Sequence, residues 1–156
     1  MSDAPCDHTS VGMLVRDGDR LLLIERKKFP FGFAPPAGHV DDDPTYEAAA
    51  IRELSEEVGL EAVSLELVLE KDKPNHCRRK DGTWHHWNVY NVTTKGDIKR
   101  SEEETKQAGW FSITEVRELA DRTQQYLQGK IPDEAWRQQP GLEPVWYEHL
   151  TDLKIL

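Results

Sequence analysis

A group of glutamates near the middle of the chain has the spacing of a metal site. Glu53, Glu56 and Glu57 are spaced i, i+3 and i+4, which places them on one face if the segment is helical. Carboxylate oxygens are hard ligands that suit Mg²⁺ or Mn²⁺. The alternative is an acidic helix face that contacts only solvent. These glutamates lie near the C-terminal end of the segment, where the helix dipole disfavours negative charge, and this favours the metal site.

The elements that would position these glutamates begin with a predicted helix. Asp43 is a candidate N-cap, Pro44 suits the first helical position, and Gly59 suits the C-terminal cap. An apolar stripe at helical spacing should face the core and consists of Ile51, Leu54 and Val58. Arg52 lies four residues before Glu56, so it can orient or neutralise a carboxylate. The sequence thus predicts a helix with defined ends and one acidic face.

The same segment contains a long signature. Its pattern is G-x5-E-x7-R-E-U-x-E-E-x-G-U, where U is apolar, and the matching residues are Gly38, Arg52, Glu53, Leu54, Glu56, Glu57, Gly59 and Leu60. On this basis the chain resembles the Nudix hydrolases, and the segments FAPPAGHV before it and SEEETKQAGWFS after it look like Nudix features too. The clear departure is Pro44, which occupies the position of the first glutamate. Asp42, Asp43 or Glu47 could supply a similar charge.

The resemblance implies an enzyme that hydrolyses a nucleoside diphosphate linked to another group, with Mg²⁺ or Mn²⁺ as cofactor. By motif position, Glu53, Glu56 and Glu57 would be metal ligands. A backbone carbonyl of Gly38 or of Ala37 would be a further ligand. A box glutamate is also close enough to a metal-bound water to take a proton from it.

Further roles follow from the same resemblance. Arg52 would orient Glu53. A general base is expected in the segment SEEET before Trp110, with Glu104 as the first choice and Glu103 as the second. The alternative for these glutamates is a solvated loop. A competing hypothesis for the whole chain is a non-catalytic Nudix domain that binds a nucleotide as a sensor or regulator, and Pro44 is its only support.

Candidate substrate-binding residues lie in two basic segments and one aromatic strand. Arg78 and Arg79 belong to the loop KDKPNHCRRKDGT, and Arg26 ends the first predicted hairpin. Guanidinium groups pair well with phosphate oxygens, although surface solvation is the alternative for each. In WHHW, Trp84 and His86 share one strand face, and one face of this strand could stack a nucleotide base. His86 is therefore a further candidate, with a structural role as the alternative.

Composition excludes several classes of protein. The 156 residues carry 29 acidic and 20 basic side chains, a net charge of −9, which argues against general nucleic-acid binding. No segment approaches the ~20 apolar residues of a membrane helix, and the N-terminus does not resemble a signal peptide. Cys6 and Cys77 form no C-x-x-C pair, so we expect neither a zinc site nor a disulfide framework. The expected location is the cytoplasm.

The order of predicted elements indicates an α/β protein. A hairpin over Val11 to Arg26 turns at Asp17-Gly18-Asp19, and the acidic helix, three strands and a second helix capped by Thr114 follow. We expect a Nudix-like α/β/α sandwich, with a mixed sheet, the box helix on one face, and C-terminal helices. The chain is predicted to be one domain over residues 1–156, with residues 121–156 as a helical extension. Aromatic residues of that extension, among them Trp146, leave body packing and a homodimer contact open.

Overall fold

The structure is a computed structural model that describes residues 5–156, in which eight strands and four helices are found. The strands are β1 (Thr9–Leu14), β2 (Arg16–Asp17), β3 (Arg20–Arg26), β4 (Phe33–Ala34), β5 (Ala37–His39), β6 (Glu61–Pro74), β7 (Trp84–Lys95) and β8 (Thr105–Phe111). The helices are α1 (Tyr46–Val58), α2 (Ile113–Leu127), α3 (Asp133–Gln138) and α4 (Pro144–Asp152). The prediction about a signal peptide falls partly on residues 1–4, outside the described residues. Within residues 5–156, no helix is both long and apolar enough to cross a membrane.

Two four-stranded sheets form the middle of the molecule. The first has the order β5-β1-β7-β6, and the second contains β2-β3-β4 with β8 paired to β3. The β1–β7 pairing is parallel, with Val11 opposite Asn88, whereas the other strand pairs are antiparallel. The expected mixed sheet is therefore confirmed, although its strands are divided between two sheets. The β2–β3 pairing turns at Gly18 and Asp19 as predicted, but β1 leaves this hairpin and pairs with β5 and β7.

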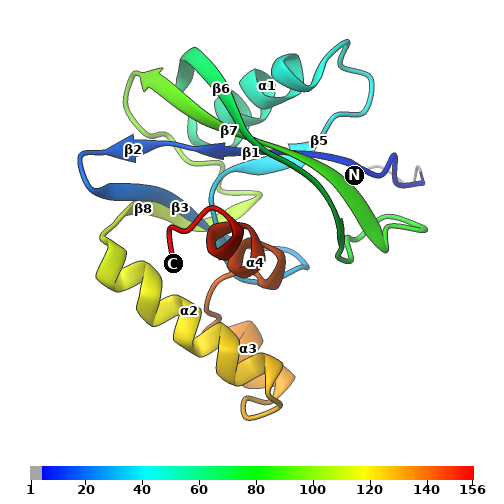
Figure 1. Ribbon diagram of the computed structural model, residues 1–156, viewed down its shortest axis with the longest axis vertical. Helices are drawn as coiled ribbons and strands as arrows, with labels where there is room; N and C mark the ends of the chain where they lie inside the picture. The colour runs from blue at the N-terminus through cyan, green and yellow to red at the C-terminus, as the bar shows by residue number, and fades with distance from the viewer. Residues whose placement is uncertain (1–4) are drawn as a thin grey trace.

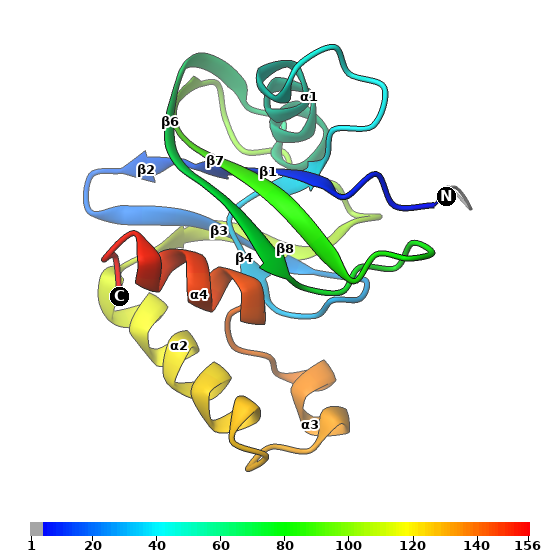
Figure 2. The same ribbon diagram turned by 45° about the vertical axis from the view of Figure 1, so that its right-hand side comes forward.

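Helices cover both sides of the strands, which confirms the α/β sandwich. Helix α1 lies on one side, and α2, α3 and α4 lie on the other (Figures 1 and 2). Alternation along β3 supplies both cores, because Leu22 and Ile24 pack in the cluster that contains α1, whereas Leu21 and Leu23 pack in the cluster that contains α2 and α4. Strands buried on both faces explain why these segments are nearly continuous apolar runs.

Helix α1 differs from its prediction at the N-terminus and on its buried face. Thr45 is the N-cap, and its side chain accepts a hydrogen bond from the Ala48 backbone N–H, so the prediction of Asp43 as N-cap is wrong. Gly59 caps the C-terminus in the left-handed conformation, as expected. Ile51 is wrong as a core residue, since it is 45% exposed. The helix is turned so that Glu57, rather than Ile51, faces inward.

The C-terminal segment packs on the strands. Trp146 of α4 is fully buried and lies against β1, where a side chain at Gly12 would overlap its ring. Ser112, not the predicted Thr114, is the N-cap of α2, and it forms a capping box with Glu115. Pro144 is the first residue of α4. Body packing is therefore the role of Trp146, one of the two alternatives that the sequence left open.

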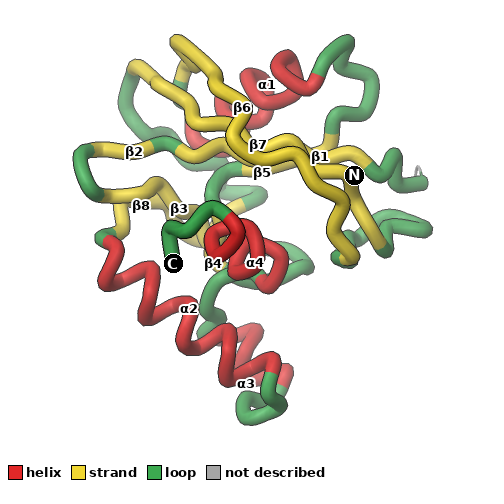
Figure 3. Tube along the Cα trace, in the orientation of Figure 1, coloured by secondary structure: helices red, strands yellow, loops and turns green. Residues whose placement is uncertain are grey.

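Long loops connect the elements around one end of the sheets (Figure 3). The segment before β1 and the β6–β7 loop lie close together in both ribbon views, and the Cys6 N–H donates a hydrogen bond of 2.9 Å to the Lys80 carbonyl. Because β5 pairs with β1, its residues lie beside the start of β1. Three segments that are distant in the sequence therefore meet beside the N-terminal half of β1.

Candidate functional site

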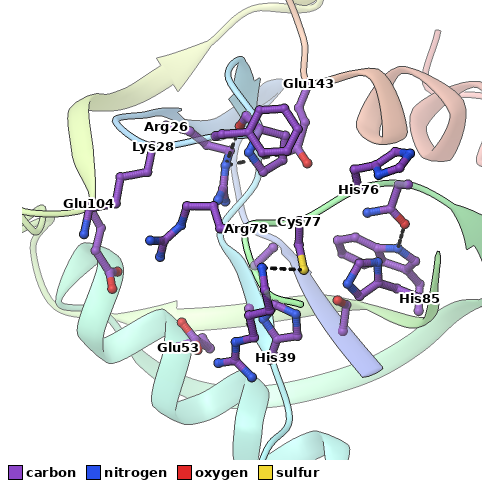
Figure 4. Close-up of a pocket in the computed structure, with 18 of the residues that line it drawn as sticks. Arg26, Lys28, His39, Glu53, His76, Cys77, Arg78, His85, Glu104 and Glu143 are labelled. Carbon is purple, nitrogen blue, oxygen red and sulfur yellow. Dashed lines mark hydrogen bonds and ion pairs between the residues drawn. The ribbon is translucent and has the colours of Figure 1, made fainter. Parts of the chain in front are cut away.

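A cavity of about 190 Å³ opens where α1, β5, the β6–β7 loop and the segment before β8 meet (Figure 4). Glu53 and Glu57 of α1 and Glu104, directly before β8, line one part of it. Helix α1 positions the first two because their i, i+4 spacing projects both side chains from one face. One carboxylate oxygen from each of the three glutamates lies within 4.8 Å of the others. The structure thus brings together carboxylates from two distant segments.

The environment of this acidic cluster suits a divalent cation. The Glu57 carboxylate accepts a hydrogen bond of 2.8 Å from the Ala37 backbone N–H. Burial, followed by repulsion from Glu53, raises the pKa of Glu57 well above its ordinary value. Burial also raises the pKa of Glu53 to about 7. A cation held by Glu53 and Glu57, with Glu104 nearby, would offset this cost, and the donor set of carboxylate oxygens fits a hard ion.

Arg52 connects the acidic cluster to the start of the helix. Its guanidinium donates hydrogen bonds to Glu53 at 3.0 Å, to Asp43 at 2.8 Å and to the His39 carbonyl at 3.1 Å. The bond to Glu56, at 3.1 Å, lies on the exposed side of the helix. Glu56 is consequently outside the cluster, and its side chain is about half exposed. Asp43 does not cap α1. Its carboxylate instead accepts the hydrogen bond from Arg52 and so holds the guanidinium in place.

Gly38 and Pro44 occupy different environments in the loop before α1. A Cβ atom at Gly38 would overlap the Glu53 carboxyl group, so the close approach of β5 to the cluster needs a glycine here. Pro44 is exposed, two residues before the first residue of α1, and does not line the cavity. The departure from the box pattern therefore lies outside the acidic cluster, which weakens the support for a non-catalytic domain.

Positively charged side chains also line the cavity. Arg26, Arg78 and Arg79 all line the cavity, as does Lys28, which follows Arg26 in the same basic segment. Figure 4 shows Arg78 extending into the cavity toward Glu104. The Arg79 guanidinium is bound by the Asp41 carboxylate, and this pair raises the pKa of Arg79 and lowers that of Asp41.

His86 lies on the other face of β7, away from the cavity. Its ring nitrogens are 2.6 Å from an Asp72 oxygen and 3.0 Å from a Glu70 oxygen. These hydrogen bonds raise its pKa, with Asp72 as the larger cause. His85 lines the cavity instead, since neighbouring strand residues point to opposite faces. The strand alternation was predicted, but the histidine chosen from it was not the one in the cavity.

Several residues of the cavity could not be found from the sequence. His39, Cys77 and His85 line the cavity, and together with Cys6, which is not part of its lining, they bring ligand atoms within 4.8 Å of one another. Glu143, at the start of α4, is buried, and burial raises its pKa to about 7 although Arg26 lies 3.8 Å away. These residues come from distant segments without a local motif, so only the tertiary structure reveals them.

A second cavity of about 550 Å³ adjoins the first. The two share Phe29, Pro30, Asn75, His76 and Glu143 in their walls. Aromatic side chains also line it, among them Phe31, which meets Phe29 at a ring-centroid distance of 6.3 Å. The molecule thus combines a charged cavity with a neighbouring aromatic one. A ligand with an anionic part and a planar part would match this pair.

The sequence of the chain matches a known protein family. Residues 7–130 match the family model of the NUDIX domain, and this range contains the acidic cluster. The chain belongs to the Nudix family. A human relative, "NAD(P)H pyrophosphatase NUDT13, mitochondrial", is 34% identical to this Nudix chain over 143 residues, covering 85% of this chain and 35% of the relative. "NAD-capped RNA hydrolase NudC" of Pseudomonas aeruginosa is 30% identical over 105 residues, covering 67% and 36%.

Solved structures support the same fold. A NUDIX hydrolase from Nitrosomonas europaea has a TM-score of 0.66 and 20% identity, covering 97% of this Nudix chain and 89% of that one. This likeness concerns the fold alone. The chain spans about a third of the length of the two curated relatives described above.

Proposed function

We propose that this Nudix chain is a hydrolase that cleaves the diphosphate linkage of a nucleoside diphosphate derivative, with Mg²⁺ as cofactor. The observation that carries the proposal is the convergence of Glu53, Glu57 and Glu104 in a cavity that positively charged side chains also line. A diphosphate needs both features, because its own negative charge opposes attack by water. Mg²⁺, when bound, screens that charge and stabilises the leaving oxygen.

Residues of the chain would bind the cation, bind the substrate and accept the proton. Glu53 and Glu57 would hold the cation from the rigid helix, with Arg52 orienting Glu53 through its 3.0 Å hydrogen bond. Arg26 and Arg78 would bind phosphate oxygens and fix the diphosphate in the cavity. A water molecule attacks one phosphorus, and the bond from that phosphorus to the bridging oxygen breaks. We propose that a Glu104 carboxylate oxygen accepts the proton of that water.

The second cavity supports a nucleoside as the neighbouring part of the substrate. Phe29 is 45% exposed at the boundary of the two cavities, so its ring is available to stack on a base. The named activities of the relatives, on NAD(P)H and on NAD-capped RNA, both involve a dinucleotide diphosphate. We therefore propose a dinucleotide of the nicotinamide type as the first substrate to test. Because Cys6 and Cys77 are free thiols, we also propose a reducing compartment such as the cytoplasm.

The experiment is a hydrolysis assay with a substrate panel. The purified chain is incubated with NADH, ADP-ribose, nucleotide sugars, dinucleoside polyphosphates and nucleoside triphosphates, with and without Mg²⁺, and release of nucleoside monophosphate or phosphate is measured. We expect Mg²⁺-dependent hydrolysis of at least one compound. Glu57→Gln should lower kcat/KM roughly 10²–10³-fold, because a bound cation supplies several kcal/mol of transition-state stabilisation.

The matched control is Glu61→Gln, since Glu61 is exposed, pairs with Lys95 and lies outside the cavity. This variant removes the same charge and should keep the activity of the wild type. Absence of hydrolysis for every compound of the panel would contradict the proposal. Equal activity of Glu57→Gln and the wild type would contradict the assignment of the acidic cluster.

A further inference from the structure

A second group of side chains that could hold a metal ion lies apart from the acidic cluster, and three of its four members line the same cavity. Cys6 precedes β1, His39 ends β5, Cys77 lies in the β6–β7 loop and His85 belongs to β7. Two thiols and two imidazoles therefore converge from four separate segments. Figure 4 shows His39, Cys77 and His85 gathered at the end of the cavity away from Glu104.

The distances within this group agree with a tetrahedral site. The Cys6 sulfur lies 3.2 Å from Nε2 of His85 and 3.5 Å from Nε2 of His39. Zinc bonds of ~2.3 Å to sulfur and ~2.0 Å to nitrogen at tetrahedral angles separate sulfur and nitrogen by roughly 3.5 Å. All four donor atoms lie within 4.8 Å of one another. Small side-chain adjustments would therefore place one ion at bonding distance from every donor.

A backbone N–H group points at each of the two sulfurs. The His8 backbone N–H points at the Cys6 sulfur at 3.3 Å, and the Arg79 backbone N–H points at the Cys77 sulfur at 3.4 Å. In both cases the donor is the second residue after the cysteine, so the two loops have the same local arrangement. Such N–H donors stabilise negative charge on sulfur and orient the ligand.

The β6–β7 loop packs tightly around the Cys77 thiol. A Cβ atom at Gly82 would overlap the Cys77 sulfur, so a glycine is needed where the loop folds back over the thiol. The Cys77 N–H also donates a hydrogen bond of 2.8 Å to the Gly82 carbonyl. The rings of His39 and His85 meet edge to face with centroids 5.3 Å apart, and the His85 side chain is buried.

We propose that Cys6, His39, Cys77 and His85 bind one Zn²⁺ ion, as a structural site separate from the acidic cluster. Two thiolates and two neutral imidazoles would neutralise the ion, and soft sulfur ligands select zinc over Mg²⁺. All four positions of a tetrahedral ion would be filled by protein, which leaves none for water or substrate. The ion would fasten the β6–β7 loop, which carries Arg78 and Arg79, to β1 and β5.

The first test compares neighbouring histidines. The chain is purified without added metal, and bound zinc is measured by inductively coupled plasma mass spectrometry. We expect one zinc per wild-type chain, a loss of at least tenfold in zinc affinity for His85→Gln, and full zinc content for His86→Gln. His86 is the matched control because it binds Asp72 and Glu70 on the opposite face. Glu57→Gln should also retain its zinc.

The second test uses the wild-type chain, so it does not depend on the folding of a variant. A mercurial reagent titrates the two cysteines of the chain, and a zinc-sensitive dye measures the metal released. One zinc should be released for two thiols modified. In a separate sample, Co²⁺ in place of Zn²⁺ should give a thiolate-to-metal charge-transfer absorption. A chain without zinc, zinc lost only in Glu57→Gln, or a Cys6–Cys77 disulfide in the purified protein would overturn the proposal.

Discussion

At the scale of single residues, glutamates that are neighbours in the sequence differ in whether they line the cavity. Glu57 is buried against the Ala37 N–H, whereas Glu56, its neighbour in the chain, faces solvent and contacts Arg52. Glu104 lines the cavity, but Glu103 does not. The path of the backbone determines these differences, since the side chains themselves are identical.

The first prediction concerns this second pair of glutamates. Glu104→Gln should lower kcat roughly 10²-fold or more at neutral pH, because an amide cannot accept the proton of the attacking water. Glu103→Gln should leave kcat unchanged, since its exposed side chain does not line the cavity. Steady-state kinetics on the best substrate measures both variants. Equal effects of the two substitutions would show that the local acidic charge, rather than one positioned base, matters.

The parts of the site that could be predicted are those whose residues lie close together in the sequence. The spacing of Glu53 and Glu57 lies within one helix, so the sequence was sufficient to propose them as ligands. The Cys6–Cys77 contact depends on β1 and the β6–β7 loop meeting in space, and no spacing rule reports this. A search for C-x-x-C pairs therefore does not detect a cluster of this kind.

At the scale of elements, only some features of helix α1 could be predicted from the sequence. Asp43 and Thr45 are both good N-cap residues, but Arg52 binds the Asp43 carboxylate, so Thr45 caps α1. Gly59 was correctly predicted, because a left-handed C-terminal residue strongly favours glycine. The buried stripe was partly wrong because the inward turn of Glu57 moves Ile51 to the surface. Interactions with other elements thus decided between local alternatives that were each reasonable.

The second prediction tests the cap of α2. Ser112→Ala should lower the free energy of unfolding by about 1 kcal/mol, because the Glu115 N–H loses the Ser112 hydroxyl as its acceptor. Thr114→Ala should be neutral or slightly stabilising, since Thr114 is exposed within the helix and alanine has the higher helix propensity. Urea unfolding monitored by circular dichroism measures both. The reverse order of effects would contradict the cap found in the structure.

At the scale of the whole molecule, the C-terminal segment completes the second core. Leu142, Trp146 and Leu150 are fully buried, and they pack with β3, β7 and α2. His149 lies in the same region, with ring centroids 4.7 Å from Trp87 and 4.9 Å from Trp146. No hydrogen-bond partner is found for either of its ring nitrogens among the described residues. A neutral imidazole is therefore built into the apolar core.

The third prediction is a loss of stability in acid that depends on His149. Burial, followed by the charge of Lys73, lowers the pKa of His149 from 6.5 to about 3. The unfolded chain therefore binds a proton in this range that the folded chain does not, so the free energy of unfolding decreases as the pH falls. The slope from this group is roughly 1.4 kcal/mol per pH unit below about pH 6.

Replacing the ring removes this contribution. His149→Phe keeps an aromatic side chain between the tryptophans, and its free energy of unfolding should depend less on pH between 6.5 and 4.5 than that of the wild type. Urea unfolding at several pH values measures the two slopes. The acidic groups near His149, such as Asp152, remain in both proteins, so they do not account for a difference. Identical slopes would mean that His149 is not buried in the neutral form.

Gly38 and His39 are consecutive residues of β5, yet one contacts the acidic cluster and the other belongs to the proposed zinc site. A strong chelator such as EDTA would therefore remove two different ions from one cavity. Inactivation by EDTA followed by recovery with Mg²⁺ alone should be incomplete, because the loop that carries Arg78 stays unfastened until zinc is returned. Brief treatment with a weak chelator, which leaves thiolate-bound zinc in place, should be fully reversible by Mg²⁺. Restoring the metals in different orders therefore distinguishes the role of Mg²⁺ in hydrolysis from the role of zinc in holding the loop.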